Sequence, residues 1–335
     1  MTTDHIPLTS SELGTLWIVY QKKTMMLRVI DSFLANNQNP EAVEILQSFH
    51  TQEDTFVKEL TNLFEQEGAA VPIGYTENDV NVNAPKLFDD IYEVMYLRTM
   101  MKVASGLHAI HMSMAYRKDI MELYKRFSAF AEDTCEKTTQ FLLEKGALPK
   151  SPGVNMPDQA EFAEGKGYRS TFKLTGNRRS LNTVEVAYLY DAIESNVSGM
   201  KLMTGFAQAA KEKETRKYFE KGKELSKKII STFTETFLES DIITPSPSAG
   251  MVTDSTIPPF SDKLMMYNTS LLSTFGLGSN AIGTSFSLRR DLSLKMVDIS
   301  KDIFTFASEG GNIMVKHGWT EEPPQMEDRT KRAKE

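Results

Sequence analysis

The feature that most constrains the fold is an internal repeat. Residues 106–120, GLHAIHMSMAYRKDI, match residues 278–292, GSNAIGTSFSLRRDL, at a constant separation of 172 positions. The chain has 335 residues, which is long enough for two domains that each have a core. A tandem duplication is therefore predicted. Further identical pairs recur at a separation of 173, among them Leu8/Leu181, Glu12/Glu185, Leu16/Leu189, Phe33/Phe206, Thr61/Thr234 and Phe64/Phe237.

Each copy is predicted to contain four helices and one long irregular segment. The irregular segments are residues 68–85 and 241–262, whose prolines and glycines exclude a continuous helix. An extended segment of 18 residues reaches about 60 Å, whereas a helix of about 28 residues is only about 42 Å long. Each segment can therefore run along a whole bundle, so that the next helix points in the same direction as the one before it.

The order helix, helix, long crossover, helix, helix is the plan of a ferritin-like bundle. The predicted fold class is all-α, with two tandem ferritin-like four-helix bundles related by a rotation. Phe162, Tyr168 and Phe172 lead us to expect that the linker between the bundles is packed against other residues. The expected division is a first bundle at 1–150, a packed linker at 151–179, a second bundle at 180–320 and a polar tail at 321–335.

The longest stretch without a formal charge is residues 264–288. Polar residues interrupt it too often for a helix in lipid, which predicts a helix covered by protein on most sides. Gly278, Ala281 and Ser285 share one face of this helix and would allow a close approach. We expect this helix and its counterpart near 99–116 to pack on each other or on their neighbours at the centre, where Ala281→Leu would overpack.

The charge and the cysteine content limit the functional classes. A net charge of −7 argues against a nucleic-acid-binding protein, which needs a concentrated basic face. The single cysteine, Cys135, predicts no internal disulfide and assembly in a reducing compartment. The N-terminal residues contain no signal-peptide pattern, so we expect cytoplasmic synthesis. The small basic clusters are predicted to be solvated surface, and they are Lys22 and Lys23, Arg178 and Arg179, Lys227 and Lys228, Arg289 and Arg290, and the tail from Arg329.

The ferritin-like plan raises the hypothesis of a carboxylate-bridged di-iron or di-manganese centre. Such a centre needs a glutamate from each of two helices and a Glu-x-x-His motif from each of the other two. No histidine follows a glutamate by three residues. A standard di-metal centre is therefore not expected in either copy. The five histidines are His5, His50, His108, His111 and His317.

A looser site for iron, manganese or zinc can still be assembled in the first copy. Histidines and carboxylates share faces of its second and third helices, and a glutamate of the fourth helix lies at a similar height. The alternative is that these histidines are surface or hydrogen-bonded core residues. The candidate ligands are His50, Glu53, His108, His111 and Glu132, with Glu136 as a substitute for Glu132. The repeat favours the alternative, because Asn280 and Gly283 replace the two histidines of the third helix in the second copy.

Several recurring charged residues are predicted to be structural. Glu12 and Glu185 stand at the third helical position of capping boxes that begin with Thr9 and Asn182. The recurrence of these glutamates therefore needs no metal. The other predicted assignments are helix N-caps for Asp119 and Asp291, and helix C-termini for Arg117 and Arg289.

The chain also resembles a known family. The stretches that carry the resemblance are LTSSELGTLWIVYQ (8–21), MPDQAEFAEGKGY (156–168), LNTVEVAYLY (181–190), RRDLS (289–293) and GWTEEPPQMEDR (318–329). They are similar to the uncharacterised tandem ferritin-like proteins of spore-forming Bacillus-type bacteria, which are related to spore coat protein F. The resemblance covers nearly the whole chain. It implies two ferritin-like bundles and a link to the spore or to sporulating cells, and it transfers no catalytic residue.

Three functional hypotheses are compatible with the sequence. The first is a non-enzymatic structural or interaction protein of the spore coat, without a cofactor, whose partners are other spore-coat or cellular proteins. The second is a metal-binding, oxidoreductase-like protein that uses the first copy. The third is a carrier that binds an apolar ligand between helices, suggested by 18 methionines and many small residues.

Overall fold

The computed structural model describes residues 6–163, 166–169, 179–243 and 250–329. These residues form eight α-helices and two short 3₁₀ helices. The helices of the first half are α1 (Ser10–Asn36), α2 (Pro40–Gln66), α3 (Asp90–Ser113) and α4 (Lys118–Glu144). Those of the second half are α5 (Thr183–Ala209), α6 (Lys213–Leu238), α7 (Asp262–Phe286) and α8 (Arg290–Lys316). The 3₁₀ helices are η1 (Glu77–Asp79) and η2 (Lys166–Arg169).

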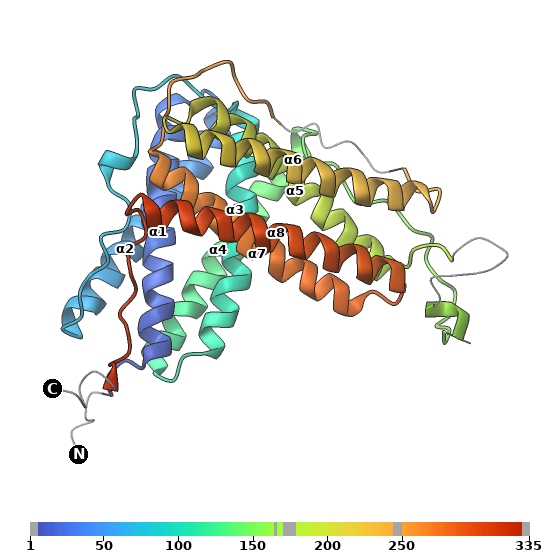
Figure 1. The fold of residues 1–335 in the computed structure, drawn as a ribbon, viewed down its shortest axis with the longest axis horizontal. Coiled ribbons are helices and arrows are strands. Elements are labelled where there is room, and N and C mark those ends of the chain that lie inside the picture. The colour runs from blue at the N-terminus through green and yellow to red at the C-terminus, as the bar shows by residue number, and fades with distance from the viewer. Residues whose placement is uncertain (1–5, 164–165, 170–178, 244–249, 330–335) are drawn as a thin grey trace.

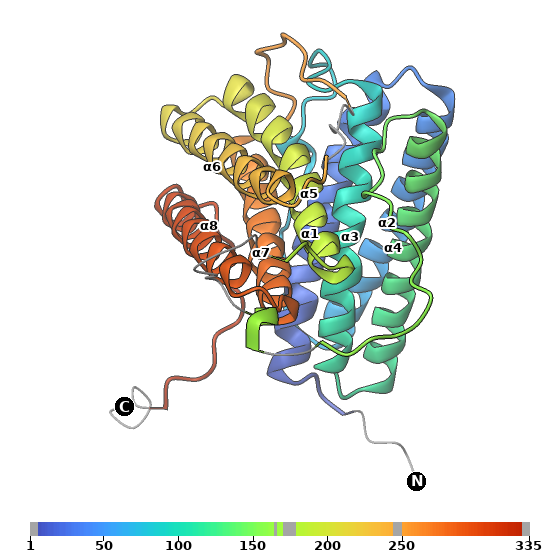
Figure 2. The ribbon, with the colours of Figure 1, turned by 90° about the vertical axis from the view of Figure 1, so that its right-hand side faces the viewer.

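Each set of four helices forms a bundle, and the two bundles meet at an angle (Figure 1; Figure 2). In the first bundle α2 and α3 run in the same direction, because residues 67–89 pass along the bundle between them (Figure 1). The predicted all-α class with two four-helix bundles is confirmed. In the second bundle, part of the connection between α6 and α7 (residues 244–249) lies outside the described residues.

The two crossover segments pair with each other through matching residues. Val80 forms an isolated antiparallel bridge with Phe260, and Phe88 forms one with Val252. Val252 and Phe260 are the repeat equivalents of Val80 and Phe88. The same pair of equivalent positions is therefore joined in both contacts, with the two halves of the chain interchanged. Exchanged contacts are the signature of surfaces related by a two-fold rotation. The two bundles are therefore arranged like the subunits of a two-fold dimer joined in one chain.

The hydrophobic core is continuous between the bundles and contains residues of all eight helices. Phe33 packs edge-to-face on Phe260 at 6.5 Å between ring centroids, and their equivalents Phe206 and Phe88 pack at 6.4 Å. Tyr96 of α3 accepts a hydrogen bond from the equivalent position of α7, the Asn268 side chain, at 2.5 Å. The first halves of α3 and α7 thus lie at the centre. The expected range 264–288 includes the central part of α7, whereas the range 99–116 lies mostly in the second half of α3. No helix in the described part of the chain is both long and apolar enough to cross a membrane.

The predicted small-residue face does not take part in this central contact. Gly278, Ala281 and Ser285 are exposed on the second half of α7, and a Cβ atom added at Gly278 would meet nothing within 4 Å. The equivalent Gly106 of α3 is exposed in the same way. The expected overpacking by Ala281→Leu is therefore wrong. Helical spacing shows which residues share a face, but not whether another helix covers that face.

The glutamates of the capping boxes have a second structural role. Glu12 closes the predicted capping box and also accepts hydrogen bonds from the backbone amides of Tyr116 and Arg117, each at 2.8 Å. Glu185 makes equivalent bonds, at 3.2 and 3.0 Å, to two amides of the turn between α7 and α8. Each carboxylate therefore ties the start of the first helix of its bundle to the turn between the third and fourth helices.

The assignments at that turn need correction. Arg117 and Arg289 occupy the N-cap positions of α4 and α8, and neither makes a side-chain capping bond. Asp119 and Asp291 are not N-caps, because they lie inside the first helical turn. Each accepts a hydrogen bond at 2.7 Å from the guanidinium group of the arginine two residues earlier, Arg117 or Arg289. The N-caps of α4 and α8 lie two residues earlier than predicted, which leaves the aspartates in the first turn, where the helix dipole still favours a negative charge.

The expected packing of the linker does not extend to Phe162, whose side chain is 96% exposed. Tyr168 does contact a neighbour, because the Arg179 guanidinium lies 4.3 Å from its ring centroid. Phe172 lies outside the described residues. In the described part of the linker, Tyr168 is thus held by Arg179, whose guanidinium group also pairs with Glu185 of α5 at 2.6 Å.

The start of the tail is bound to the first bundle. Glu321 accepts hydrogen bonds from the backbone amides of Ile73 at 2.6 Å and Gly74 at 2.9 Å. The side-chain amide of Gln21 donates to the same carboxylate at 2.7 Å. This contact joins the C-terminal segment to the first crossover and to α1.

Candidate functional site

Five titratable side chains lie inside the first bundle, and we call them the buried polar cluster. Lys22 and Lys23 come from α1, Glu53 from α2, and His108 and His111 from α3. All five are buried, and the two lysines and the glutamate are each 1% exposed. The lysines are held there because apolar residues precede and follow them and α1 is covered by protein on nearly every side.

Lys23 and Glu53 form a salt bridge within the cluster. The Lys23 Nζ atom donates to the Glu53 Oε2 atom at 2.8 Å. The same ammonium group lies 4.6 Å from the ring centroid of Phe56 and 4.2 Å from that of Phe127, so cation–π attraction adds to the ion pair. Burial lowers the pKa of Lys23, while the charge of Glu53 opposes that shift. Protein groups thus surround the ammonium group.

Lys22 has no comparable partner. No carboxylate within the described residues forms a salt bridge with it. Burial, opposed in part by Glu53 and reinforced by Lys23, lowers the pKa of Lys22 from 10.5 to about 7. At neutral pH this buried amine therefore exists in both its charged and its neutral form.

The two histidines are neutral imidazoles at physiological pH. Burial and the charge of Lys22 lower the pKa of His111 to about 4, and they hold the pKa of His108 well below its ordinary value. Both ring nitrogens of His108, the Nδ1 atom of His111 and the Oε1 atom of Glu53 have no hydrogen-bond partner in the described part of the protein. An unsatisfied buried polar group costs about 1–3 kcal/mol. The cluster therefore contains hydrogen-bonding groups that the protein itself does not use.

The other predicted metal ligands lie outside the cluster. His50 bonds through Nε2 to the Asp31 Oδ1 atom at 2.8 Å, and its side chain is partly exposed. Glu132 and Glu136 are exposed on α4. Among the residues that the structure describes, no group of three or more His, Cys, Asp or Glu side chains is placed to hold a metal ion. Of the predicted ligands, the cluster brings together Glu53, His108 and His111.

Sequence reasoning missed the two lysines of the cluster. The prediction of solvated surface is wrong for Lys22 and Lys23, and also for Arg289, which is buried at the turn before α8. It is right for Lys227 and Lys228, which are exposed on α6. The signal that distinguishes the two lysine pairs is their context. The pair in α1 is flanked by long apolar runs, whereas the pair in α6 belongs to a strongly amphipathic helix.

The second bundle does not repeat the cluster. Its equivalent positions hold uncharged residues, so the ion pair and both imidazoles are absent there. These residues are Ser195, Asn196, Ser226, Asn280 and Gly283. The two halves of the molecule therefore share a fold but differ in the chemistry of their centres.

Among solved structures, a "putative spore coat protein" of Bacillus halodurans C-125 is similar to this chain. The two are 16% identical, with a TM-score of 0.42 over 45% of this chain and 98% of that one. No curated protein matches the chain.

A protein family matches both halves of the chain, at residues 1–159 and again at residues 169–331. The boundary between the two matches falls in the linker between α4 and α5, so each match corresponds to one bundle. The matches leave only a few residues uncovered. The chain therefore belongs to the family described as "Protein of unknown function (DUF3231)" and carries two tandem copies of its domain.

Proposed function

We propose that the protein is a non-enzymatic structural or interaction protein. The observation that carries the proposal is the buried salt bridge of 2.8 Å between Lys23 and Glu53. In a ferritin-like plan, the bundle interior is where carboxylates and histidines would hold metal ions. Here an ammonium group lies among those residue types, and its positive charge opposes the binding of a cation. A substrate has no open path to side chains that are 1% exposed.

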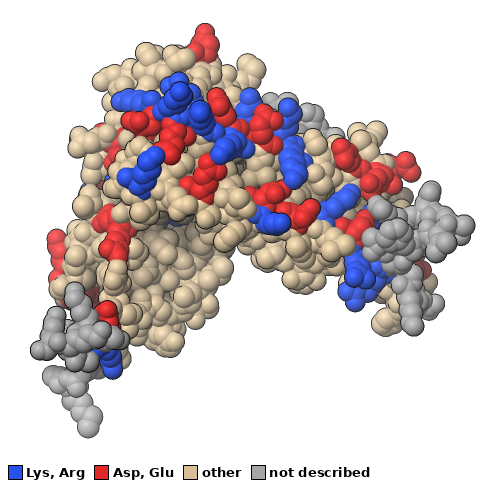
Figure 3. Space-filling model, viewed as in Figure 1, with Lys and Arg blue, Asp and Glu red and all other residues tan. Residues whose placement is uncertain are grey.

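The charge distribution supports protein partners rather than nucleic acid. On the face shown in Figure 3, basic and acidic residues are interleaved over α6 and α8. Pairs between the two helices neutralise one another, as Lys221 with Glu309 and Lys228 with Asp302, each at 2.6 Å. A nucleic-acid-binding face would instead concentrate basic residues.

The proposal further assigns the protein to the spore coat, in association with other coat proteins. It is supported by the resemblance of the motifs at 8–21, 156–168 and 318–329 to proteins of spore-forming bacteria. A fluorescent fusion of the full chain, made in a sporulating Bacillus-type host, is expected to move from the cytoplasm to the spore coat. The free fluorescent protein is the control. A signal that stays diffuse through sporulation would contradict the association.

Metal binding by the buried polar cluster is the second candidate function. It is favoured by the unpartnered nitrogens of His108 and His111 and by the Oε1 atom of Glu53. Neutral imidazoles and a carboxylate are ligands for iron, manganese and zinc. The salt bridge to Lys23 and the nearby charge of Lys22 oppose such binding.

Metal analysis separates the two candidates. Protein from cells supplied with iron, manganese and zinc and purified without chelator is expected to contain far less than one metal ion per chain. The double variant His108→Gln, His111→Gln is expected to contain the same small amount, measured by inductively coupled plasma mass spectrometry. His50→Gln, which lies outside the cluster, is the control. A stoichiometric metal that only the double variant loses would make metal binding the better assignment.

A further inference from the structure

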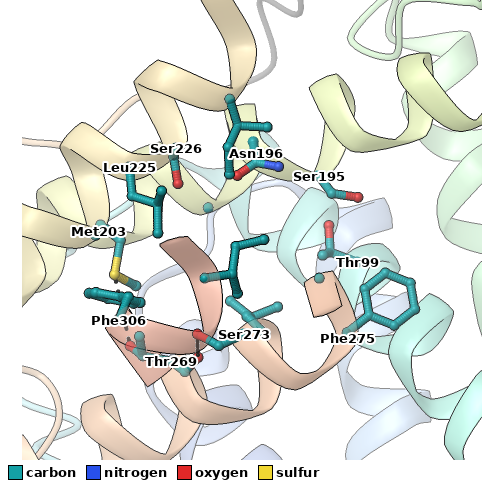
Figure 4. Close-up of a pocket in the computed structure, with 16 residues that line it drawn as sticks. Thr99, Ser195, Asn196, Met203, Leu225, Ser226, Thr269, Ser273, Phe275 and Phe306 are labelled. Carbon is teal, nitrogen blue, oxygen red and sulfur yellow. Dashed lines mark hydrogen bonds between the residues drawn. The ribbon is translucent and has the colours of Figure 1, made fainter. Parts of the chain in front are cut away.

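The second bundle contains a cavity at the place where the first bundle holds its salt bridge. Its volume is about 100 Å³. Ser195, Asn196 and Ser226 line it, and they are the repeat equivalents of the two lysines and the glutamate of the buried polar cluster. Side chains from α3, α5, α6, α7 and α8 surround the space (Figure 4). The cavity is therefore the counterpart of the buried polar cluster.

Two glycines replace large residues in the wall of the cavity. Gly199 and Gly222 line it at the positions where the first bundle has Met26 and Phe49. A Cβ atom added at Gly199 would make an ordinary contact of 3.6 Å with Ser226 Oγ, whereas one added at Gly222 would lie 2.7 Å from Phe306, so Phe306 already occupies the space beside Gly222. Unfilled volume of this kind costs stability, by about 24 cal/mol per Å³ in a measured series from another protein. A ligand that fills the space would recover part of that cost.

The walls of the cavity are mainly apolar and carry no charge. Leucine, isoleucine, methionine and phenylalanine side chains provide most of the surface, including Met203, Leu225 and Phe306 (Figure 4). None of the lining residues is Asp, Glu, Lys, Arg or His. A charged ligand would lose its hydration without gaining a counter-charge. The chemistry of the walls therefore selects a neutral ligand.

Two hydroxyl groups of the lining are free to bond a ligand. Thr99, Thr269 and Ser273 donate to carbonyl oxygens of their own helices at 2.9 Å. The Ser195 Oγ atom is buried without a partner, and the Ser226 Oγ atom also forms no hydrogen bond in the described part of the chain. These two serines are the polar groups that can hold a ligand hydroxyl, while the rest of the ligand contacts apolar side chains.

We propose that this cavity binds a small neutral molecule with one hydroxyl group, of the phenol or short-chain alcohol class. A dry cavity of about 150 Å³ engineered in another protein holds benzene, so a volume of about 100 Å³ suits a single ring or a shorter alkyl chain. The apolar part of the ligand packs against Leu225, Ile303 and Phe306, and its hydroxyl group bonds to a serine of the lining, Ser195 or Ser226. In the first bundle the corresponding positions hold the Lys23–Glu53 ion pair, Met26 and Phe49, whose side chains are large and buried.

The test uses phenol, benzene and benzoate as probes of the full-length protein. Titration calorimetry is expected to show binding of phenol and benzene but not of benzoate, and phenol is expected to raise the melting temperature. The double change Ser195→Ala, Ser226→Ala is expected to weaken the binding of phenol and leave that of benzene unchanged. Absence of phenol and benzene binding, or equal binding of benzoate, would overturn the proposal.

A matched pair of variants locates the site. Gly199→Met introduces the side chain that the first bundle has at this position, and it is expected to weaken phenol binding by about tenfold or more. Gly278→Met makes the same change on an exposed face of α7 where nothing lies within 4 Å, and it is expected to bind like the wild type. If Gly199→Met does not fold, nuclear Overhauser effects from phenol protons to the Ile229 and Ile303 methyl groups of the wild type must be seen. Equal binding by both variants, or absence of these effects, would contradict the assignment.

Discussion

Glu53→Ala is expected to destabilise the protein by about 3–5 kcal/mol, because it leaves one charge of a buried ion pair without its partner. The Lys23 ammonium group would remain between Phe56 and Phe127, 1% exposed and without the carboxylate that now lies 2.8 Å away. Urea unfolding followed by circular dichroism measures the difference in the free energy of unfolding.

Two further variants serve as controls for this prediction. Asp54→Ala removes a neighbouring carboxylate that is 41% exposed and paired with Lys58, and it is expected to change the free energy of unfolding by less than about 1 kcal/mol. The double change Lys23→Met, Glu53→Met removes both charges and is expected to be neutral or stabilising. If Glu53→Ala lowers the free energy of unfolding no more than Asp54→Ala does, the prediction is wrong and the salt bridge does not contribute to stability as stated.

The architecture could be predicted because the sequence pattern of one bundle occurs twice in the chain. The match between residues 106–120 and 278–292 defines the repeat, and the length of the segment at 68–85 requires a crossover. Local rules were sufficient at Glu12 and Glu185, where the capping boxes are present as expected. A capping box depends on residues three positions apart, which is why the sequence alone reveals it.

The contents of the bundle interiors could not be predicted in the same way. Lys22 and Lys23 are charged, and charged residues are almost never fully buried unless they are paired. Only the folded structure shows that Glu53 of another helix lies beside Lys23. The exposed positions of Gly278 and Ala281 are a second case, because burial depends on which elements pack together across the molecule. Both errors therefore concern contacts between elements far apart in sequence.

The duplication explains how two different interiors coexist in one protein. The shared core and the paired crossovers hold the bundles together, and both bundles retain the carboxylate that fixes the turn before the fourth helix. The interiors are free to differ, so one contains an ion pair and the other a cavity.

Lys22→Met is expected to stabilise the protein at pH 7 by about 2 kcal/mol or more, because each unit of pKa shift corresponds to about 1.4 kcal/mol. Met has a similar length, so it fills the same space without a charge. The groups that face Lys22 are Lys23 on its own helix, Glu53 of α2, and His108 and His111 of α3, and only Glu53 favours its ionised form.

The dependence of this effect on pH identifies its cause. The pKa of Lys22 is 10.5 in the unfolded chain and about 7 in the folded protein, so the unfolded chain binds the extra proton between these values. The stability of the wild type relative to Lys22→Met therefore falls as the pH decreases from 10.5 to 7, and it is constant below that range. Urea unfolding at pH 7 and pH 10 is expected to show a large difference between the two proteins at pH 7 and a small one at pH 10. Lys125→Met, at a side chain that is 58% exposed, should show little difference at either pH. A difference for Lys22→Met that does not change with pH would mean that packing, and not the buried charge, separates it from the wild type.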